Sequence, residues 1–153
     1  MTSVVTHLEK LIKAIPDKLK AWPEERMVTP RAVGKWSNLQ ILGHLCDSAI
    51  NNLTRMIQAQ SASEPLAITP YNQDKWVEAQ RYADASVNEI ITLWASLNSA
   101  LIRVITAVPE NLIRAKQIRL TSGEQHTLEW LISDYLEHMK HHLHQISPKL
   151  LED

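Results

Sequence analysis

The sequence predicts an all-α domain folded as a four-helix bundle, and three observations support that prediction. Glycine occurs only three times in 153 residues, whereas Leu, Ile and Ala make up most of the apolar set. Such a composition favours helices over short strands joined by tight turns. Four long segments carry apolar residues at three- and four-residue steps, and their connections differ in length. We therefore expect a bundle with a long crossover between its second and third helices.

Length and charge limit the organisation and the class of partner. The 153 residues suit one domain, 1–153, and show no internal repeat. With 16 basic and 17 acidic residues, a net charge of -1 gives no electrostatic reason to expect nucleic acid or an anionic membrane surface. The single cysteine, Cys46, excludes an intramolecular disulfide, and no segment resembles a signal peptide or an apolar span of about 20 residues. We expect a soluble, cytoplasmic protein whose partner is a small molecule or another chain.

The first two helices are expected near the N-terminus. The first lies within residues 3–21, where "THLE" at 6–9 is a possible capping box and Pro16 is expected to kink or restart the helix. The second has the clearest start in the chain. In "WSNLQI", Ser37 is the predicted N-cap and Gln40 its reciprocal partner, while Trp36 and Ile41 form a hydrophobic staple. This helix should continue to about residue 59.

The second half of the chain contains the crossover and two more helices. "SASEPLAITPYNQDKW" is rich in turn-forming residues and predicts a loop before a short helix at about 72–82. "SVNE" at 86–89 is a capping box for the third helix. "RAKQIRLTSGEQHT" predicts a small hairpin about a Ser-Gly turn, and the fourth helix should begin at Thr127 and end before Pro148. The third helix has one wide apolar face: Val87, Ile90, Trp94, Leu97, Leu101, Val104 and Val108.

Four of the seven histidines lie within residues 135–146 of the fourth helix. His138 and His142 are one turn apart and project within about 40° of each other, at the border of the apolar stripe. His144 points away, and His141 lies on the far flank of the pair. An i, i+4 histidine pair can bind one metal ion. On spacing alone, however, a partly exposed polar face is the commoner explanation.

The second helix carries a polar stripe without lysine, formed by Gln40, His44, Asp47, Ser48, Asn51 and Arg55. Two interpretations are about equally supported by the pattern. The stripe lies opposite the apolar centre of the helix, as a solvated face would. Its few charges and many amide and hydroxyl groups instead suit the lining of a cleft.

Three segments together resemble the DinB-like superfamily, and in particular its metal-dependent hydrolases and bacillithiol transferases. They are "GKWSNLQILGHLCDSAINNL", "PYNQDKW" and "DYLEHMKHHLHQI", and the resemblance covers nearly the whole chain. It implies a four-helix bundle of the DinB-like type with one divalent metal ion bound by His44, His138 and His142. His141 matches a family histidine that is not a usual ligand, and His144 stands where the family pattern varies.

Three histidine ligands without a fourth protein donor leave a coordination position for water or substrate. The ion, Zn or Ni, could then activate water for hydrolysis or a thiol for nucleophilic attack. The resemblance favours an S-transferase that joins a low-molecular-weight thiol, such as bacillithiol, to an electrophilic small molecule. The alternatives are a metal-dependent hydrolase and a bundle that binds metal or ligand without turnover.

Further residues are predicted to support this site, although each could instead be an ordinary surface or core residue. Side chains next to metal ligands commonly fix the orientation of an imidazole ring. The five tryptophans are expected mainly as core residues, although Trp36 and Trp76 could line the mouth of the site. The family resemblance suggests a homodimer. The candidates for a second shell or pocket are Asp47, Asn51, Arg55, Tyr135 and Gln145.

Overall fold

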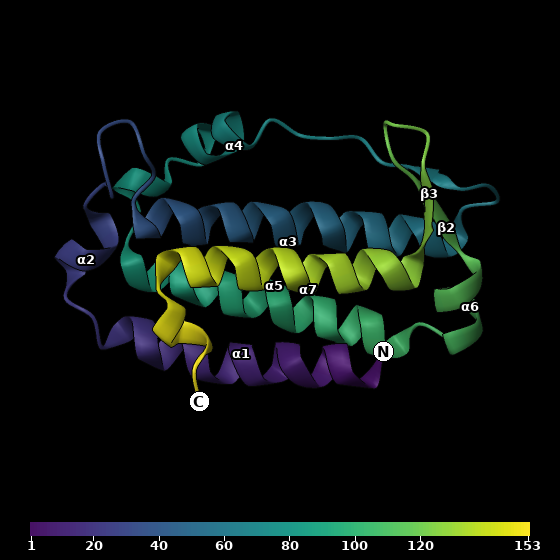
Figure 1. Cartoon of the computed structure of the whole chain (residues 1–153), viewed down its shortest axis with the longest axis horizontal. Coiled ribbons are helices and arrows are strands. Elements are labelled where there is room, and N and C mark those ends of the chain that lie inside the picture. Colours follow the sequence, from purple (N-terminus) through teal and green to yellow (C-terminus); the bar gives the residue numbers. More distant parts are fainter.

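A computed structural model describes all 153 residues and confirms the all-α bundle (Figure 1). The four long helices are α1 (Thr2–Lys20), α3 (Asn38–Ser61), α5 (Val87–Ala107) and α7 (Leu128–Ile146). Shorter elements lie between them and after them: α2 (Glu24–Val28), β1 (Leu66–Ala67), α4 (Gln73–Ala79), η1 (Tyr82–Asp84), α6 (Glu110–Ala115), β2 (Gln117–Arg119), β3 (Gln125–Thr127) and η2 (Pro148–Leu151).

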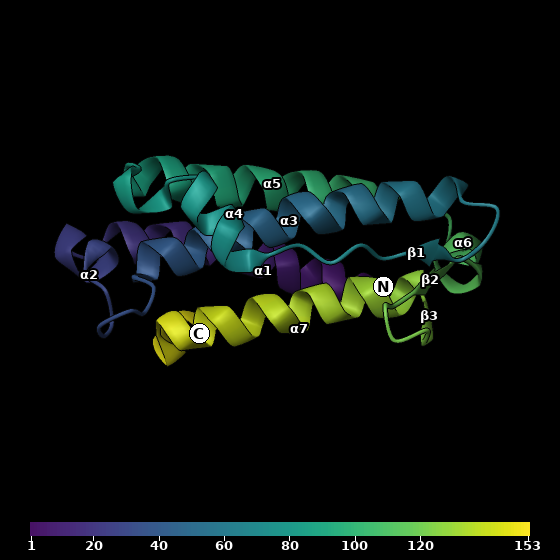
Figure 2. The same cartoon turned by 90° about the horizontal axis from the view of Figure 1, so that it is seen from above.

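The predicted crossover joins α3 to α5, and the direction of these two helices explains its length. Both run the same way through the bundle, so the chain must return along the whole molecule before α5 can begin (Figure 1). The segment that contains β1 and α4 makes this return and passes above the α3–α7 side of the bundle (Figures 1 and 2). Around the bundle, α3 packs against α5 and α7, and α1 packs against α5. The metal site that the resemblance implies requires the second and fourth long helices to be adjacent, and α3 and α7 are.

The capping box predicted at the start of the second long helix is confirmed, and both of its hydrogen bonds are present. The Ser37 hydroxyl accepts a hydrogen bond from the Gln40 N–H at 3.2 Å, and the Gln40 side chain accepts one from the Ser37 N–H at 2.9 Å. Ser86 and Thr127 cap α5 and α7 by accepting hydrogen bonds from the N–H groups of Glu89 and Trp130, but the reciprocal bond of the predicted "SVNE" capping box is not formed. The "THLE" prediction is wrong, because α1 begins at Thr2 and the Thr6 hydroxyl donates to the Thr2 carbonyl inside the helix.

The first helix also continues through its proline. Pro16 lies inside α1, which extends to Lys20 without a restart. A proline removes one backbone donor, yet buried Ile15 and Leu19 hold this end of the helix in the core. Two short helices, α2 and α6, were not predicted, since five or six residues carry too little periodicity to be recognised.

The predicted hairpin forms and is extended by a third strand. β2 pairs with β3 in antiparallel register, and β1 of the crossover adds to β2 in parallel. The Lys116 ammonium donates to the Ala62 carbonyl at 2.7 Å, and the Ile68 N–H donates to the Arg119 carbonyl at 2.9 Å. These bonds fix the start of the crossover to the same end of the bundle as the hairpin.

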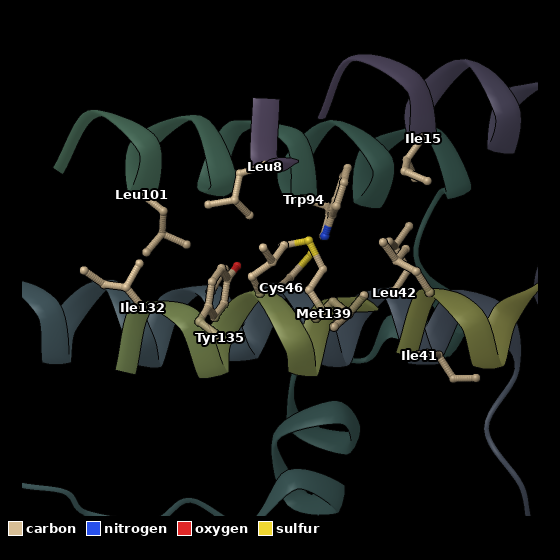
Figure 3. Packing of buried hydrophobic residues seen from close by; sticks show 14 of the residues in the cluster. Leu8, Ile15, Ile41, Leu42, Cys46, Trp94, Leu101, Ile132, Tyr135 and Met139 are labelled. Atoms are coloured by element: carbon tan, nitrogen blue, oxygen red, sulfur yellow. The ribbon is translucent and has the colours of Figure 1, made fainter. Parts of the chain in front are cut away.

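A continuous apolar core fills the space between the long helices (Figure 3). Trp94 of α5 is fully buried among side chains of α1, α3 and α7. Cys46 of α3 is also buried, and this burial raises the pKa of its thiol. Contrary to the sequence expectation, α5 is long and apolar enough by length and composition to cross a membrane. In this structure Ile91, Trp94 and Leu101 of α5 are buried in the bundle core.

Candidate metal centre

The structure brings together the three histidines that the sequence singled out. His44 comes from the second turn of α3, and His138 and His142 come from successive turns of α7. One ring nitrogen from each lies within 4.8 Å of the others. His44 is fully buried, while His138 and His142 are half-buried, so the cluster opens towards solvent on the α7 side.

The spacing of the ring nitrogens suits a small divalent ion. Nε2 of His44 and Nε2 of His138 are 3.4 Å apart. Two ligands at 2.0–2.1 Å from a tetrahedral zinc ion are separated by about 3.3–3.4 Å. The ring of His142 lies 4.6 Å from each of the other two rings, measured between centroids. The three side chains therefore fit one metal ion without a large rearrangement.

Hydrogen bonds at the opposite ring atoms orient two of the three imidazoles. Nδ1 of His142 lies 2.8 Å from Oε1 of Gln145, and Nδ1 of His138 lies 3.4 Å from the Ser48 hydroxyl. A proton on Nδ1 in each ring would leave the lone pair on Nε2, the tautomer that a ligand needs. Nδ1 of His44 is buried and has no partner.

The surroundings keep the cluster neutral. Burial, followed by repulsion from His142 and His138, lowers the pKa of His44 from 6.5 to about 3. Burial and the same kind of repulsion lower the pKa of His138 to about 4 and also lower that of His142. The three imidazoles are thus unprotonated at neutral pH, so no proton competes with a metal ion for their lone pairs.

Only some of the supporting residues predicted from the sequence lie next to the histidines or to a cavity beside them. Gln145 bonds to His142, and Arg55 lines a cavity that reaches His138. Asp47 instead accepts hydrogen bonds from the Tyr82 hydroxyl at 2.7 Å and from Gln80 at 3.1 Å.

Two other candidates point away from the histidines. Asn51 donates to the backbone carbonyl of Asp47, one turn earlier in its own helix. The ring of Tyr135 borders the cavity, but its hydroxyl donates to Oδ1 of Asn98 at 2.6 Å inside the core.

Burial raises the pKa of the Asp47 carboxyl, the charged member of the polar stripe nearest to His44 in sequence. Its second oxygen is buried without a partner. The carboxyl therefore ties η1 and the end of α4 to α3, and no hydrogen bond connects it to the histidine rings.

Ser48 is the site residue that sequence reasoning missed. It belongs to the polar stripe of α3, four residues after His44, and was given no role of its own. Its hydroxyl contacts His138 and also receives a hydrogen bond from Asn52 at 3.3 Å. The spacing of four residues from a candidate ligand, on the same helical face, was the available signal.

One cavity is bordered by a member of the histidine cluster, and a second is bordered by residues that contact the cluster. The first, of about 390 Å³, lies between α3 and α7 beneath the crossover and the hairpin, and His138 is the member of the cluster that borders it. The second, of about 570 Å³, is bordered by Trp36 and Gln145. The Trp36 ring lies 5.3 Å from the His44 ring, whereas the Trp76 ring packs against Tyr71.

His141 and His144 remain outside the cluster, as helical phase predicted. Both side chains are exposed, and neither ring nitrogen belongs to the group that could hold one metal ion. The His141 ring lies 5.0 Å from the His142 ring between centroids. It therefore borders the site without facing its centre.

Comparison with known proteins places these features in a family. A model of the DinB superfamily matches residues 7–146. YfiT of Bacillus subtilis, described as a probable metal-dependent hydrolase with an unusual four-helix bundle topology, is 24% identical over 142 residues, which cover 90% of this chain and 79% of YfiT. A protein of Bacillus mycoides that also carries a provisional metal-dependent hydrolase name is 24% identical over 143 residues, covering 94% of this chain and 81% of its own length.

Two solved structures share the fold. The structure of YfiT superposes with a TM-score of 0.83 at 21% identity, covering 97% of this chain and 86% of YfiT. A mycothiol-dependent maleylpyruvate isomerase superposes with a TM-score of 0.74 at 11% identity. That match covers 95% of this chain but only 60% of the isomerase, so the larger protein has further structure that this chain does not match.

Proposed function

This chain belongs to the DinB superfamily, and from that premise we propose that it is a metal-dependent S-transferase that joins a low-molecular-weight thiol to an electrophilic small molecule. The observation that carries the proposal is the convergence of His44, His138 and His142 beside two separate cavities. Two substrates need two binding spaces near one reactive centre. His138 borders one cavity, and Trp36 and Gln145, which contact His44 and His142, border the other.

The chain's own residues would prepare the site for a divalent ion. His44, His138 and His142 would bind it through Nε2, while Ser48 and Gln145 hold the rings of His138 and His142. The ion would supply the positive charge that lets a thiol ionise at neutral pH. Because all three ligands are neutral, they would cancel none of that charge.

The reaction balances without an oxidant or a reductant. The thiol sulfur, once its proton is lost, forms a bond to an electrophilic carbon of the second substrate. The carbon's bond to a halide breaks, or the C–O bond of an epoxide opens and its oxygen takes up a proton. The thiol proton leaves to solvent, and the cavity bordered by Trp36 would hold the electrophile.

The relatives support two candidate reactions, thiol transfer and hydrolysis. The mycothiol dependence of the isomerase with the same fold supports a thiol co-substrate. The hydrolase names of YfiT and the Bacillus mycoides protein support the second candidate, in which water rather than a thiol is activated at the histidines.

Metal content and product formation test the proposal together. Purified protein loaded with Zn or Ni is offered a thiol with a chlorinated aromatic or an epoxide, and separately ester and amide substrates. Conjugate formation that disappears in His44→Ala and His142→Ala but persists in His144→Ala is the expected result. Ester or amide hydrolysis without conjugation would favour the hydrolase, and full metal content in His44→Ala would contradict the three-histidine site.

A further inference from the structure

The outward side of α5 is unlike that of an ordinary surface helix. A helix at the surface of a bundle normally presents several charged side chains to water. Between Glu89 and Arg103, however, the sequence "IITLWASLNSALI" contains no charged residue. Only 33% of the residues in the apolar stretch of α5 are buried. The core of the bundle therefore uses only part of the apolar surface that this helix offers.

The outward stripe of α5 has small side chains in its middle and one charge of each sign at its ends. Glu89, Ser96 and Arg103 are seven residues apart, so they project within about 40° of one another. All three are exposed, as is Thr92, while Ala100 is half-buried. Glu89 and Arg103 each lie about 10 Å along the axis from Ser96. The stripe is thus centred on Ser96, with opposite charges at equal distances from it.

Neither charge of the stripe has a partner within the chain. The ion pairs of the protein join other residues. Glu89 bonds to Ser86 only through its backbone N–H, and the Arg103 guanidinium forms no hydrogen bond. On the neighbouring α3, the only charged side chain after Ile50 is Arg55, which donates to the Thr69 carbonyl of the crossover. Both charges of the stripe are therefore available to a partner.

Apolar side chains border the stripe. Leu93 and Leu97, one turn apart on α5, are partly exposed. Ile57 of α3 is 50% exposed. It lies eleven residues, about three turns, after Cys46 and so on the side of α3 from which the Cys46 thiol contacts the Ile90 carbonyl of α5. We call the stripe with these three side chains the α5 face.

The rest of the chain leaves the α5 face open. The crossover passes above the α3–α7 side, and α5 lies at the edge of the bundle opposite α7 (Figure 2). The metal centre is built from α3 and α7. A partner on the α5 face would therefore cover neither the three histidines nor the cavity between α3 and α7.

We propose that the α5 face binds a second copy of this chain, with the two α5 helices antiparallel and a twofold axis at Ser96. Glu89 of each copy then meets Arg103 of the other, because both residues lie seven positions from the axis. The small side chains of Thr92, Ser96 and Ala100 let the two helices approach closely. A parallel pairing would instead place Glu89 against Glu89 and Arg103 against Arg103.

The charge pattern favours a second copy over other partners. A membrane surface or a nucleic acid is normally met by a cluster of basic residues, whereas the α5 face has one charge of each sign. Exposed ion pairs contribute little affinity. The apolar contact, which adds Leu93, Leu97 and Ile57 of both copies, therefore supplies most of the stability, and the two ion pairs fix direction and register.

Disulfide crosslinking maps the contact with mild substitutions. In helices packed about 8–10 Å apart, two Ser96→Cys side chains at the axis are within disulfide distance. Two Thr92→Cys side chains would be about 12 Å apart along the axis. Both positions are exposed, so random collisions would crosslink them equally, and the native Cys46 is buried. Under mild oxidation we expect Ser96→Cys to form a covalent dimer at least about tenfold faster than Thr92→Cys.

Analytical ultracentrifugation of charge variants tests the register. Glu89→Lys and Arg103→Glu should each raise the dimer Kd about tenfold or more, because the twofold axis places each new charge beside a like charge twice. The Glu89→Lys/Arg103→Glu double variant restores two opposite-charge pairs, so its Kd should return to within about threefold of the parent value. Glu64→Lys and Lys13→Glu, at exposed positions outside the α5 face, should leave the Kd unchanged.

Circular dichroism and metal content confirm that each variant is folded, since the α5 face contributes no residue to the metal centre. A monomer at all concentrations would overturn the inference. A dimer that crosslinks equally through Ser96→Cys and Thr92→Cys would place the contact elsewhere, and a double variant as weak as the single ones would refute the antiparallel register. A monomer that binds neutral phospholipid vesicles, and loses this binding in Ser96→Arg, would assign the α5 face to a membrane instead.

Discussion

Replacement of Gly43 by Ala should destabilise this protein, although helix propensity alone predicts the opposite. Gly43 lies inside α3, where alanine is normally about 1 kcal/mol better than glycine. A Cβ atom built on Gly43 would lie 2.3 Å from both Cγ and Cδ2 of the Tyr82 ring. The close approach of η1 to α3 therefore requires a residue without a side chain at this position.

The size of the destabilisation follows from the packing and the hydrogen bond that the Tyr82 ring would lose. Carbon atoms pack at about 3.5–4.0 Å, so the ring must move by more than about 1 Å. Tyr82 is buried, and its hydroxyl donates to the Asp47 carboxyl at 2.7 Å. Overpacking costs about 1–3 kcal/mol, and a lost hydrogen bond to a charged group costs about 1.5–3 kcal/mol. After the gain of about 1 kcal/mol in helix propensity, we expect a net loss of about 1.5–5 kcal/mol.

Urea unfolding followed by circular dichroism measures this loss, and thermal unfolding should show a decrease in Tm of about 3–20 °C. Tyr82→Phe keeps the ring and removes the hydrogen bond, so it separates the two contributions. In a Tyr82→Ala background there is no ring to displace, and Gly43→Ala should then stabilise by about 1 kcal/mol. A Gly43→Ala protein as stable as the parent would refute the reasoning.

Four other predictions concern the site, the core and the assembly. The pKa values of His44 and His138 are lowered to about 3 and about 4. The unfolded chain therefore binds more protons than the folded chain below pH 6.5. As the pH falls from 6.5 to about 4, the metal-free protein should lose up to about 1.4 kcal/mol of stability per pH unit for each histidine. In urea titrations the stability of the His44→Ala/His138→Ala double variant should depend less steeply on pH, and a slope equal to that of the parent would contradict the assignment. Gln145→Ala should weaken metal binding about 10-fold or more, measured by competition with a chelator, because the His142 ring loses its partner. Tyr135→Phe should cost about 1–3 kcal/mol in urea unfolding without changing metal content, since Asn98 is left buried without its donor. Light scattering should give a homodimer mass, and a concentration-independent mass of 17.4 kDa would contradict that expectation.

The parts of the fold that the sequence predicted are those specified by local chemistry. The reciprocal Ser37–Gln40 hydrogen bonds depend on residues three apart, so the start of α3 can be read directly. The start of α1 could not be read this way, because Thr6 is a good cap in isolation but the helix extends four residues further upstream. The pairing of β1 with β2 joins residues about 50 apart in sequence, and no local pattern encodes it.

The site shows the same division between local and distant information. Helical phase separates His138 and His142 from His144, because the positions on one helix fix their relative directions. The participation of His44 rested on a resemblance, since spacing cannot show which helices become neighbours. The Ser48–His138 contact joins residues 90 apart and was missed for that reason.

The long crossover decides between the two interpretations of the polar stripe on α3. A solvated face would leave its polar groups to water, but His44, Asp47 and Ser48 are buried. The groups that cover Asp47 come from the crossover: the Tyr82 hydroxyl and the Gln80 amide both donate hydrogen bonds to its carboxyl. Because burying polar groups is costly unless they gain partners, the sequence of the crossover must supply those partners wherever it crosses the stripe. The stripe is therefore the interior of a lined cleft, which explains why it contains no lysine.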